Sequence, residues 1–264
     1  MPTYLDAIVE LRRTDVAAAK VAVPLAELKA RARAAPPARD FVAALARPGV
    51  QVIAEVKKAS PSRGDIAPTA DPATVARSYA SAGAAAISVL TEERHFKGKL
   101  EYLQAIKGAL GAACPPLLRK DFIIDAYQIY EARAYGADAL LLIVASLTDV
   151  ELAELQGLTH ELGMATLVEV HDAAEAARAV ASGAKVIGIN NRDLHSFKTN
   201  LETTREVRPH IPAGHIVVSE SGIRTREDVE RLSGWGVNAF LVGEALMTAP
   251  EPGAELRKLL GRRD

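Results

Sequence analysis

From residue 51 to the end of the chain, short apolar runs alternate with stretches of helical periodicity. The apolar runs cover residues 52–56, 85–90, 116–118, 139–144, 165–170, 186–189, 216–218 and 239–242. The helical stretches that follow them cover residues 72–81, 100–110, 126–135, 149–162, 173–182, 201–207, 224–232 and 255–260. Short runs that are mainly apolar, without alternation of apolar and polar residues, are typical of strands buried on both faces. The alternation therefore predicts eight consecutive strand–helix units.

The number and size of these units select a fold. Eight units within about 210 residues match a (β/α)8 barrel. Several helical stretches end at a glycine, such as Gly83, Gly136 and Gly163, as helix C-termini often do. An open, doubly wound α/β sheet is the structural alternative. The first predicted strand is not followed by G-x-G-x-x-G, which weakens a dinucleotide-binding version of that alternative. We therefore predict an α/β protein with a (β/α)8 TIM-barrel fold.

Residues 1–48 precede the alternation and have a different pattern. Three amphipathic stretches in this region are expected to be helices: 5–13, 25–34 and 41–46. The region shows no core of its own, so we expect a single domain over 1–264 with 1–48 as a helical N-terminal extension. We also expect the extension to lie against the substrate-binding face of the barrel, with Leu5, Ile8 and Val9 buried.

Charge and composition argue against several classes of function. The chain has 32 basic and 33 acidic residues without segregation and a net charge of −1, so neither a nucleic-acid nor a membrane-surface partner is expected. The longest apolar run, 139–145, is too short to span a bilayer. No signal peptide is visible, and the single cysteine, Cys114, fits a reducing compartment. We expect a cytoplasmic monomer.

Polar residues recur where the predicted strands end. In strand order they are Glu55, Lys57 and Ser60; Thr91 and Glu92; Arg119, Lys120 and Asp121; Glu169; Asn190, Asn191 and Arg192; Glu220, Ser221 and Gly222; Gly243 and Glu244. The carboxyl ends of the strands line the active site of a (β/α)8 barrel. A single strand-end charge could simply reach solvent, but buried charges are costly unless paired or used. Their recurrence predicts an active site at this end of the barrel.

The last two strand ends have the pattern of a phosphate site. Ser221-Gly222 and Gly243-Glu244 follow the seventh and eighth predicted strands, where barrels often bind phosphate with backbone N–H groups. Glycine lets the backbone approach an anion closely, and Ser221 adds a hydroxyl donor. Two ordinary turns that contain glycine would produce the same pattern, so both interpretations stay open at this point.

Histidine and cysteine provide no metal-site pattern. The six histidines lack the spacing of metal ligands, so no metal is expected. We interpret His171 and His195 as solvated turn residues. Cys114 precedes two prolines and has no base nearby in the sequence, so a structural role is predicted for its thiol.

One segment resembles a known family. Residues 53–62, Ile-Ala-Glu-Val-Lys-Lys-Ala-Ser-Pro-Ser, closely resemble the signature of the indole-3-glycerol-phosphate synthases, ribulose-phosphate-binding barrels of tryptophan biosynthesis. Further segments agree with this family in the same order: 91–92 with 96–98, 118–122, 167–171, 188–194, 219–223 and 242–247. The resemblance covers nearly the whole chain and includes the helical extension.

The resemblance implies a lyase that needs neither cofactor nor metal. Its phosphosugar substrate, 1-(2-carboxyphenylamino)-1-deoxyribulose 5-phosphate, would undergo ring closure, decarboxylation and dehydration to indole-3-glycerol phosphate. Lys120 matches the family's general acid, and Glu169 matches its catalytic carboxylate. Lys57 would hold the substrate carboxylate or act as a second acid, while Glu55 would keep Lys57 charged. The sequence leaves open how the proton transfers divide among these four residues.

The same resemblance implies the remaining site residues. Asn190 and Glu220 would complete the catalytic set, and Arg192 would help to position the substrate. The residues that match the phosphate site are Ser60, Ser221, Gly222, Gly243 and Glu244. Glu244 is expected to contribute only its backbone N–H, because its side chain should turn away from a dianion. The apolar floor for the anthranilate ring would consist of Phe96, Phe122 and Leu194.

Two other functions compete with the lyase. A phosphoribosylanthranilate isomerase would need an acid–base pair, usually a cysteine and an aspartate, but Cys114 precedes the third predicted strand instead of following it. A non-catalytic phosphate-binding barrel would not need Lys57, Lys120 and Glu169 together. We therefore favour the lyase.

Overall fold

A closed parallel barrel forms the body of the protein. The computed structural model describes residues 4–193 and 196–262. Its barrel has the strand order β1-β10-β9-β8-β7-β6-β5-β4. These strands are β1 (Gln51–Val56), β4 (Ala86–Leu90), β5 (Leu117–Lys120), β6 (Ala139–Ile143), β7 (Ala165–Val170), β8 (Val186–Asn190), β9 (Ile216–Glu220) and β10 (Ala239–Val242). Pairing of β1 with β10 closes the barrel. The predicted (β/α)8 fold is therefore confirmed, and the open sheet is wrong.

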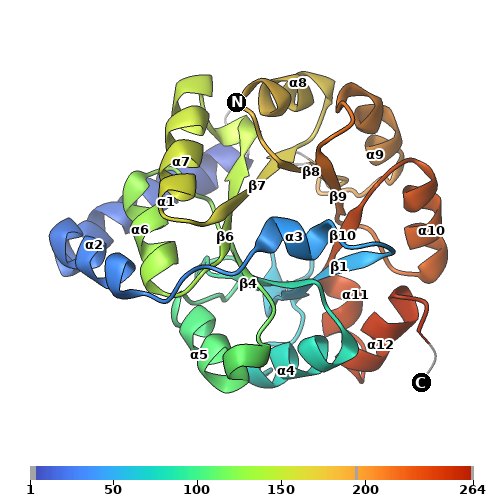
Figure 1. Ribbon diagram of the computed structural model, residues 1–264, viewed down its shortest axis with the longest axis horizontal. Coiled ribbons are helices and arrows are strands. Elements are labelled where there is room, and N and C mark those ends of the chain that lie inside the picture. The colour runs from blue at the N-terminus through green and yellow to red at the C-terminus, as the bar shows by residue number, and fades with distance from the viewer. Residues whose placement is uncertain (1–3, 194–195, 263–264) are drawn as a thin grey trace.

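Helices follow the strands and form an outer ring (Figure 1). They are α4 (Pro72–Ala82), α5 (Glu101–Leu110), α6 (Ala126–Ala134), α7 (Asp149–Glu161), α8 (Ala173–Ala181), α9 (Glu202–Val207), α10 (Arg226–Gly234), α11 (Glu244–Met247) and α12 (Pro252–Leu259). Short polar side chains start several of them. Asp71, Thr148 and Thr225, for example, each accept a backbone N–H at the beginning of a helix. Each such cap stabilises a helix by about 1 kcal/mol. Among the described residues, no helix is both long and apolar enough to cross a membrane.

Three strands extend further than their apolar patterns predicted. β5, β8 and β9 continue to Lys120, Asn190 and Glu220, respectively. The polar residues take part in the strand ladder: Lys120 is paired in register with Leu90, and Asn190 with Glu220. The predicted boundaries were wrong because they followed hydrophobicity, whereas backbone pairing continues regardless of a charged side chain. The polar side chains are consequently held by the barrel wall itself.

The extension covers both ends of the barrel. It consists of α1 (Tyr4–Ala22), α2 (Leu25–Ala34) and α3 (Phe41–Leu45). Leu5, Ile8 and Val9 on α1 are buried, as expected, and α1 lies at the carboxyl ends of the strands. In contrast, Phe41 and Leu45 pack at the amino ends, and Figure 1 shows α3 across the end that faces the viewer. The helix α2 packs on the outside of the barrel against α6. The expectation that the whole extension faces the substrate is therefore wrong for α2 and α3.

Side-chain alternation divides the barrel interior into an apolar half and a polar half. Successive residues of a strand point to opposite faces, so residues two apart enter the same side. On β5, Leu118 belongs to the inner apolar cluster and Lys120 lies one layer above it. On β7, Leu167 and Glu169 have the same relation. The apolar layer stabilises the barrel, and the polar layer forms the floor of a cavity.

Candidate active site

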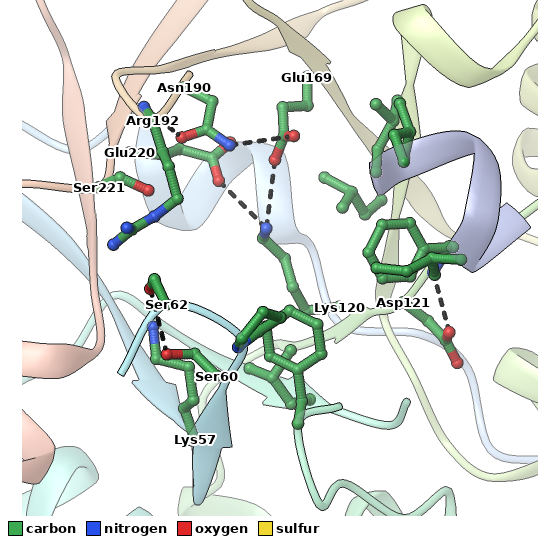
Figure 2. A pocket seen from close by; sticks show the side chains of 18 of the residues that line it. Lys57, Ser60, Ser62, Lys120, Asp121, Glu169, Asn190, Arg192, Glu220 and Ser221 are labelled. Carbon is green, nitrogen blue, oxygen red and sulfur yellow. Dashed lines mark hydrogen bonds and ion pairs between the residues drawn. The ribbon is translucent and has the colours of Figure 1, made fainter. Parts of the chain in front are cut away.

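A cavity of about 130 Å³ opens at the carboxyl ends of the strands. Most of the residues proposed from the sequence lie in its lining (Figure 2). These are Glu55, Lys57, Ser60, Phe96, Lys120, Phe122, Glu169, Asn190, Arg192, Glu220 and Ser221. The structure thus brings together residues from six strands and the loops that follow them. Leu194 lies outside the described residues.

Lys120 is the centre of the polar layer. Its Nζ lies 3.2 Å from Glu169 Oε2 and 3.5 Å from Glu220 Oε2. Figure 2 shows the ammonium group pointing between these two carboxylates. Burial disfavours the ammonium, but the charges of the surrounding carboxylates, Glu55 included, outweigh that effect and raise the pKa of Lys120. Lys120 is therefore a proton carrier that stays charged at neutral pH.

Glu169 is held from both sides. Its Oε2 faces Lys120, and its Oε1 accepts a hydrogen bond of 3.2 Å from Asn190 Nδ2. Burial alone would raise the pKa of Glu169, but the Lys120 charge and the contact with His171 lower it well below its usual range. Glu169 is consequently an oriented carboxylate anion inside the cavity.

Glu220 has the opposite electrostatic behaviour. Burial, together with the negative charges of Glu169 and Glu55, raises the pKa of Glu220 to about 8. Apart from the ion-pair contact with Lys120, neither carboxylate oxygen has a hydrogen-bond partner among the described residues. Gly188 makes room for it, since a Cβ there would come 2.1 Å from Glu220 Oε1. A buried oxygen without a partner in a cavity is suited to contact a ligand.

The second lysine lies on the other side of the cavity. Lys57 Nζ is 3.0 Å from Glu55 Oε1, and Glu55 Oε2 accepts a hydrogen bond of 3.2 Å from Ser88. Burial opposes the charge on Glu55, but Lys57 and Lys120 outweigh it and lower the pKa of Glu55. Figure 2 places Lys57 beside Ser60, across the cavity from Lys120. The two ammonium groups can therefore approach different parts of one ligand.

A smaller cavity adjoins this side and contains the residues expected to bind phosphate. Ser221, Gly222, Gly243 and Glu244 line it, together with Lys57. Ser221 and Gly222 have φ angles of 66° and 81°, a left-handed pair that turns the backbone sharply after β9. A Cβ on Gly243 would lie 2.5 Å from Glu55 Oε1, so any other residue there would displace the Glu55 carboxylate. Backbone N–H groups and a cation at one corner are suited to bind an anion.

The carboxylate of Glu244 lies among three arginine side chains at the edge of the smaller cavity. The distances from Glu244 to Arg63, Arg224 and Arg192 are 3.4, 3.6 and 3.9 Å. Arginine commonly pairs with both carboxylates and phosphates. This corner therefore has more positive than negative charge, which is suited to an incoming anion.

Apolar side chains form the remaining wall. The rings of Phe96 and Phe122 are 6.2 Å apart, and both line the main cavity. Sequence reasoning missed Tyr4, Leu141 and Leu241, which also line it. Leu141 lies in a run where every residue is apolar, so periodicity could not distinguish its face. The wall is suited to contact an aromatic ring.

Some strand-end residues lie outside the cavity, contrary to expectation. The backbone N–H groups of Arg94, His95 and Phe96 donate to Glu92, which fixes the loop after β4. Thr91 and Arg119 take part in a buried network outside the barrel wall. They do not line the cavity, because adjacent residues on a strand point to opposite faces.

Asn191 also supports the site without lining the cavity. Its Nδ2 donates to Ser219 Oγ at 2.9 Å and to the Ser221 carbonyl at 3.1 Å. The Asn191 side chain is buried, and its Oδ1 accepts from the Thr204 hydroxyl at 2.7 Å. Asn191 therefore fixes the turn that presents Ser221 to the smaller cavity.

His171 is not a solvated turn residue. Its side chain is 14% exposed and lies between two carboxylates, 3.4 Å from Glu169 and 3.0 Å from Glu175. The interpretation failed because Glu169 is two residues away on the same face of β7, and Glu175 is one turn into α8. The other histidine interpreted in this way, His195, lies outside the described residues. Within the described ranges, no group of His, Cys, Asp and Glu has the arrangement of a metal site.

Known proteins with similar sequences share one name. The model of the family "Indole-3-glycerol phosphate synthase" matches residues 5–259. A relative with that name from Roseiflexus sp. (strain RS-1) is 54% identical over 267 residues, which cover 99% of each chain. Another, from Mycobacterium avium (strain 104), is 49% identical over 258 residues and matches 98% of this chain and 94% of its own.

Similar solved structures are more distant and support the fold. Thiamine phosphate pyrophosphorylase from Pyrococcus furiosus has a TM-score of 0.61 at 17% identity, covering 83% of this chain and 96% of its own. A 3-hexulose-6-phosphate synthase has a TM-score of 0.60 at 16% identity, with coverages of 81% and 98%. From the sequence matches over nearly its full length, the chain belongs to the indole-3-glycerol phosphate synthase family.

Proposed function

We propose that the cavity binds 1-(2-carboxyphenylamino)-1-deoxyribulose 5-phosphate and converts it to indole-3-glycerol phosphate, the product named in the family description. The observation that carries the proposal is the buried Lys120 ammonium, held among carboxylates beside an aromatic wall. Ring closure needs an acid at a carbonyl oxygen and a surface for an aromatic ring. Both are present in one cavity.

The substrate would lie across the mouth of the barrel. Its phosphate would occupy the smaller cavity at the N–H groups of Gly222 and Gly243, with Ser60 and Ser221 as hydroxyl donors. The anthranilate ring would lie against the aromatic wall at the opposite side. Arg192 lines both cavities and would contact the chain that connects the two ends. The reacting C2′ carbonyl would then be near Lys120.

Ring closure is the first chemical step. The ring carbon that bears the carboxylate attacks C2′, a carbon–carbon bond forms, and the electron pair of the carbonyl moves to its oxygen. The Lys120 ammonium supplies a proton to that oxygen. An alkoxide is a stronger base than an amine, so the transfer is favourable despite the raised pKa of Lys120. The ring nitrogen becomes an iminium, which the Glu169 anion stabilises.

Decarboxylation and dehydration complete the reaction. Loss of CO2 returns the electron pair of the breaking bond to the ring system and neutralises the iminium. The C2′ hydroxyl then leaves as water, while Glu169 accepts a proton from C1′. Lys57 is the second ammonium group in the cavity and would protonate the leaving hydroxyl. With two ammonium groups, the enzyme does not need to recharge Lys120 between the steps.

Asn190 and Glu220 would position the substrate within this set. Asn190 holds the Glu169 carboxylate through its amide group. Burial and the neighbouring carboxylates raise the pKa of Glu220, which favours its protonated form, and that form can donate a hydrogen bond to a substrate hydroxyl. Its oxygens have no hydrogen-bond partner among the described residues, which leaves them available for that contact.

An activity assay tests the proposal. The purified chain is incubated with 1-(2-carboxyphenylamino)-1-deoxyribulose 5-phosphate, and formation of the fluorescent indole product is followed over time. A parallel reaction contains N-(5-phosphoribosyl)anthranilate, the substrate of the competing isomerase. Cys114, the cysteine considered for that isomerase, lies before β5 and outside the cavity lining. Turnover of the first substrate alone supports the lyase, whereas turnover of the second alone, or of neither, contradicts it.

We further propose that the protein acts as a cytoplasmic monomer. The residues assigned to the reaction all come from one chain, so no second copy is needed to complete the described cavity. Light scattering after size-exclusion chromatography should give a mass close to 28.1 kDa. A larger assembly whose dissociation abolishes activity would contradict the proposal.

A further inference from the structure

The carboxyl end of β7 holds a histidine against the catalytic carboxylate, and the reaction described above does not use it. We propose that His171 is a positioning residue that keeps Glu169 oriented, and keeps it ionised until the dehydration step in which Glu169 accepts a proton. The proposal rests on the function assigned to the cavity. It concerns a residue that acts through Glu169 and does not line the main cavity.

The local geometry fixes the imidazole ring from two elements. Glu169 and His171 are two residues apart and leave β7 on the same side. Glu175, in the first turn of α8, accepts the His171 backbone N–H at 2.8 Å and lies 3.0 Å from ring Nδ1. Asp172 caps α8 by accepting the Glu175 N–H at 2.8 Å. Glu175 is therefore held in place, and it directs the opposite ring nitrogen toward Glu169.

Both ring nitrogens of His171 face carboxylate oxygens. Nδ1 lies beside Glu175 Oε2, and Nε2 lies 3.4 Å from Glu169 Oε1. A neutral imidazole has one donor nitrogen and one acceptor nitrogen, so it would place a lone pair against one of the carboxylates. Only the imidazolium ion has an N–H at Nδ1, within hydrogen-bond distance of Glu175, and another at Nε2, within ion-pair distance of Glu169. The geometry therefore favours a charged histidine.

The surrounding charges agree with this protonation state. Burial disfavours the imidazolium, but the hydrogen bonds and charges of Glu169 and Glu175 outweigh it and raise the pKa of His171 to about 10. A surface cavity on the far side of the ring is lined by further charged groups from α1, α8 and the loop after β8: Asp6, Asp172, Arg192 and Asp193. Three of these four groups are acidic, and none of the four lies on β7.

The role proposed for His171 follows from a difference between the two cations that contact Glu169. Lys120 and His171 contact different oxygens of Glu169. Lys120 loses its charge when it protonates the substrate oxygen in ring closure. The pKa of Glu169 would rise at that moment if Lys120 were its sole cationic neighbour. His171 keeps its proton and therefore keeps Glu169 negative while the iminium is present.

The variant His171→Asn removes the charge and retains a polar side chain. We expect the single-turnover rate to fall about 10–100-fold, the usual cost of a misplaced catalytic group, with little change in KM. The acid limb of the kcat profile should move to higher pH by about one to three units, because the pKa of Glu169 rises when a cation is removed. His171→Lys, which restores a positive charge, should move the acid limb part of the way back.

His160 provides a matched control. It lies on α7 and lines a separate cavity with Arg39 and Lys185, away from the residues assigned to the reaction. His160→Asn makes the same substitution away from Glu169 and should leave the rate and the pH profile equal to those of the parent. An equal shift in both asparagine variants would show that the effect does not depend on contact with Glu169, and would overturn the proposal.

A titration of the parent protein completes the test. The ring signals of His171 are followed by NMR in the intact chain and assigned by their response to Glu175→Gln. A midpoint near the value of about 10 supports the proposal, and a midpoint near the ordinary 6.5 overturns it even if His171→Asn does not fold. An active parent with a His171→Asn variant of unchanged rate and acid limb also overturns it. An inactive parent would instead reject the function proposed for the cavity, while the titration would still report on His171.

Discussion

Arg119 and Lys120 are neighbouring cations on β5, the first buried and the second half-buried, yet they belong to different kinds of polar cluster. Arg119 points out of the barrel, where it donates to Thr91, to the Gln128 carbonyl and to Asp121 at 3.2, 2.7 and 3.0 Å. Lys120 points inward among carboxylates. Its contacts include Glu220, whose oxygens lack hydrogen-bond partners in the described chain.

The outer cluster is closed by its own hydrogen bonds. Asp121 accepts from Thr91 at 2.6 Å, from Arg12 at 3.1 Å and from the Phe122 N–H at 2.8 Å. This network ties α1 to β5 and provides hydrogen-bond partners for the side chains of Arg119 and Asp121. The inner cluster opens into a cavity and keeps unsatisfied oxygens. Both clusters bury charged groups, so burial alone does not indicate function. The difference that indicates function is whether the buried polar atoms have hydrogen-bond partners within the protein.

The largest effect on the inner cluster is expected from Glu169→Gln. The substitution keeps the size of the side chain and removes the anion that stabilises the iminium, so turnover should fall about 10²–10⁴-fold. Unfolding by denaturant should remain cooperative. Steady-state kinetics and a denaturation curve on the same preparation test this expectation. A variant that loses stability and keeps its specific activity would assign Glu169 to the structural group, together with Arg119.

A smaller effect is expected at the phosphate corner. Gly243→Val would place side-chain atoms against Glu55, since even a Cβ would lie 2.5 Å from its Oε1. Backbone approach to the phosphate should be obstructed, and the dissociation constant of the substrate should rise about 10–100-fold, with less effect on the chemical step. Calorimetric titration with a reduced substrate analogue measures the change. Gly234→Val, at a site with open space around its Cβ position, is the control.

A further expected effect is a pH dependence of stability caused by Glu220. Its pKa in the folded protein, about 8, lies above its ordinary value of 4.5. Between these two pKa values, the folded state holds a proton that the unfolded chain releases. The resulting stabilisation of the folded state is complete below pH 4.5 and is lost as pH rises to about 8. The loss is at most about 1.4 kcal/mol per pH unit.

Glu220→Gln imitates the protonated form and removes this dependence. The free energy of unfolding of the variant, relative to that of the parent, should rise between about pH 5 and about pH 8. Denaturation curves across this range test the expectation. A constant difference between Glu220→Gln and the parent would mean that Glu220 is ionised throughout.

The fold could be predicted largely from the sequence because its signal is repeated. Short apolar runs separated by helical patterns recur along the whole barrel, and errors at single boundaries do not change the topology. The boundaries of β5, β8 and β9 were wrong where the strand interior becomes polar. The placement of α3 was also wrong, because an amphipathic pattern shows that one face is buried but not at which end of the barrel.

The sequence predicted most of the residues that form the candidate site, but not which way their side chains point or how their pKa values shift. The strand ends identified Lys120 and Glu169, yet they identified Arg119 equally well, because the direction of a side chain depends on register. His171 was misinterpreted because its partners belong to two elements whose approach is known only in three dimensions. The raised pKa of Glu220 likewise depends on charges from β1 and β7.

The contrast between the two neighbours on β5 is tested most directly by measuring single-turnover rate and unfolding free energy for Arg119→Met and Lys120→Met. For Lys120→Met we expect a cooperative fold and a rate that falls about 10²–10⁴-fold. For Arg119→Met we expect a loss of about 3–5 kcal/mol of stability, because Asp121 is left buried without its main partner, and a rate per folded molecule close to that of the parent. A near-parental rate in Lys120→Met, or an equal loss of rate in folded Arg119→Met, would contradict the assignment of catalysis to the inner cluster.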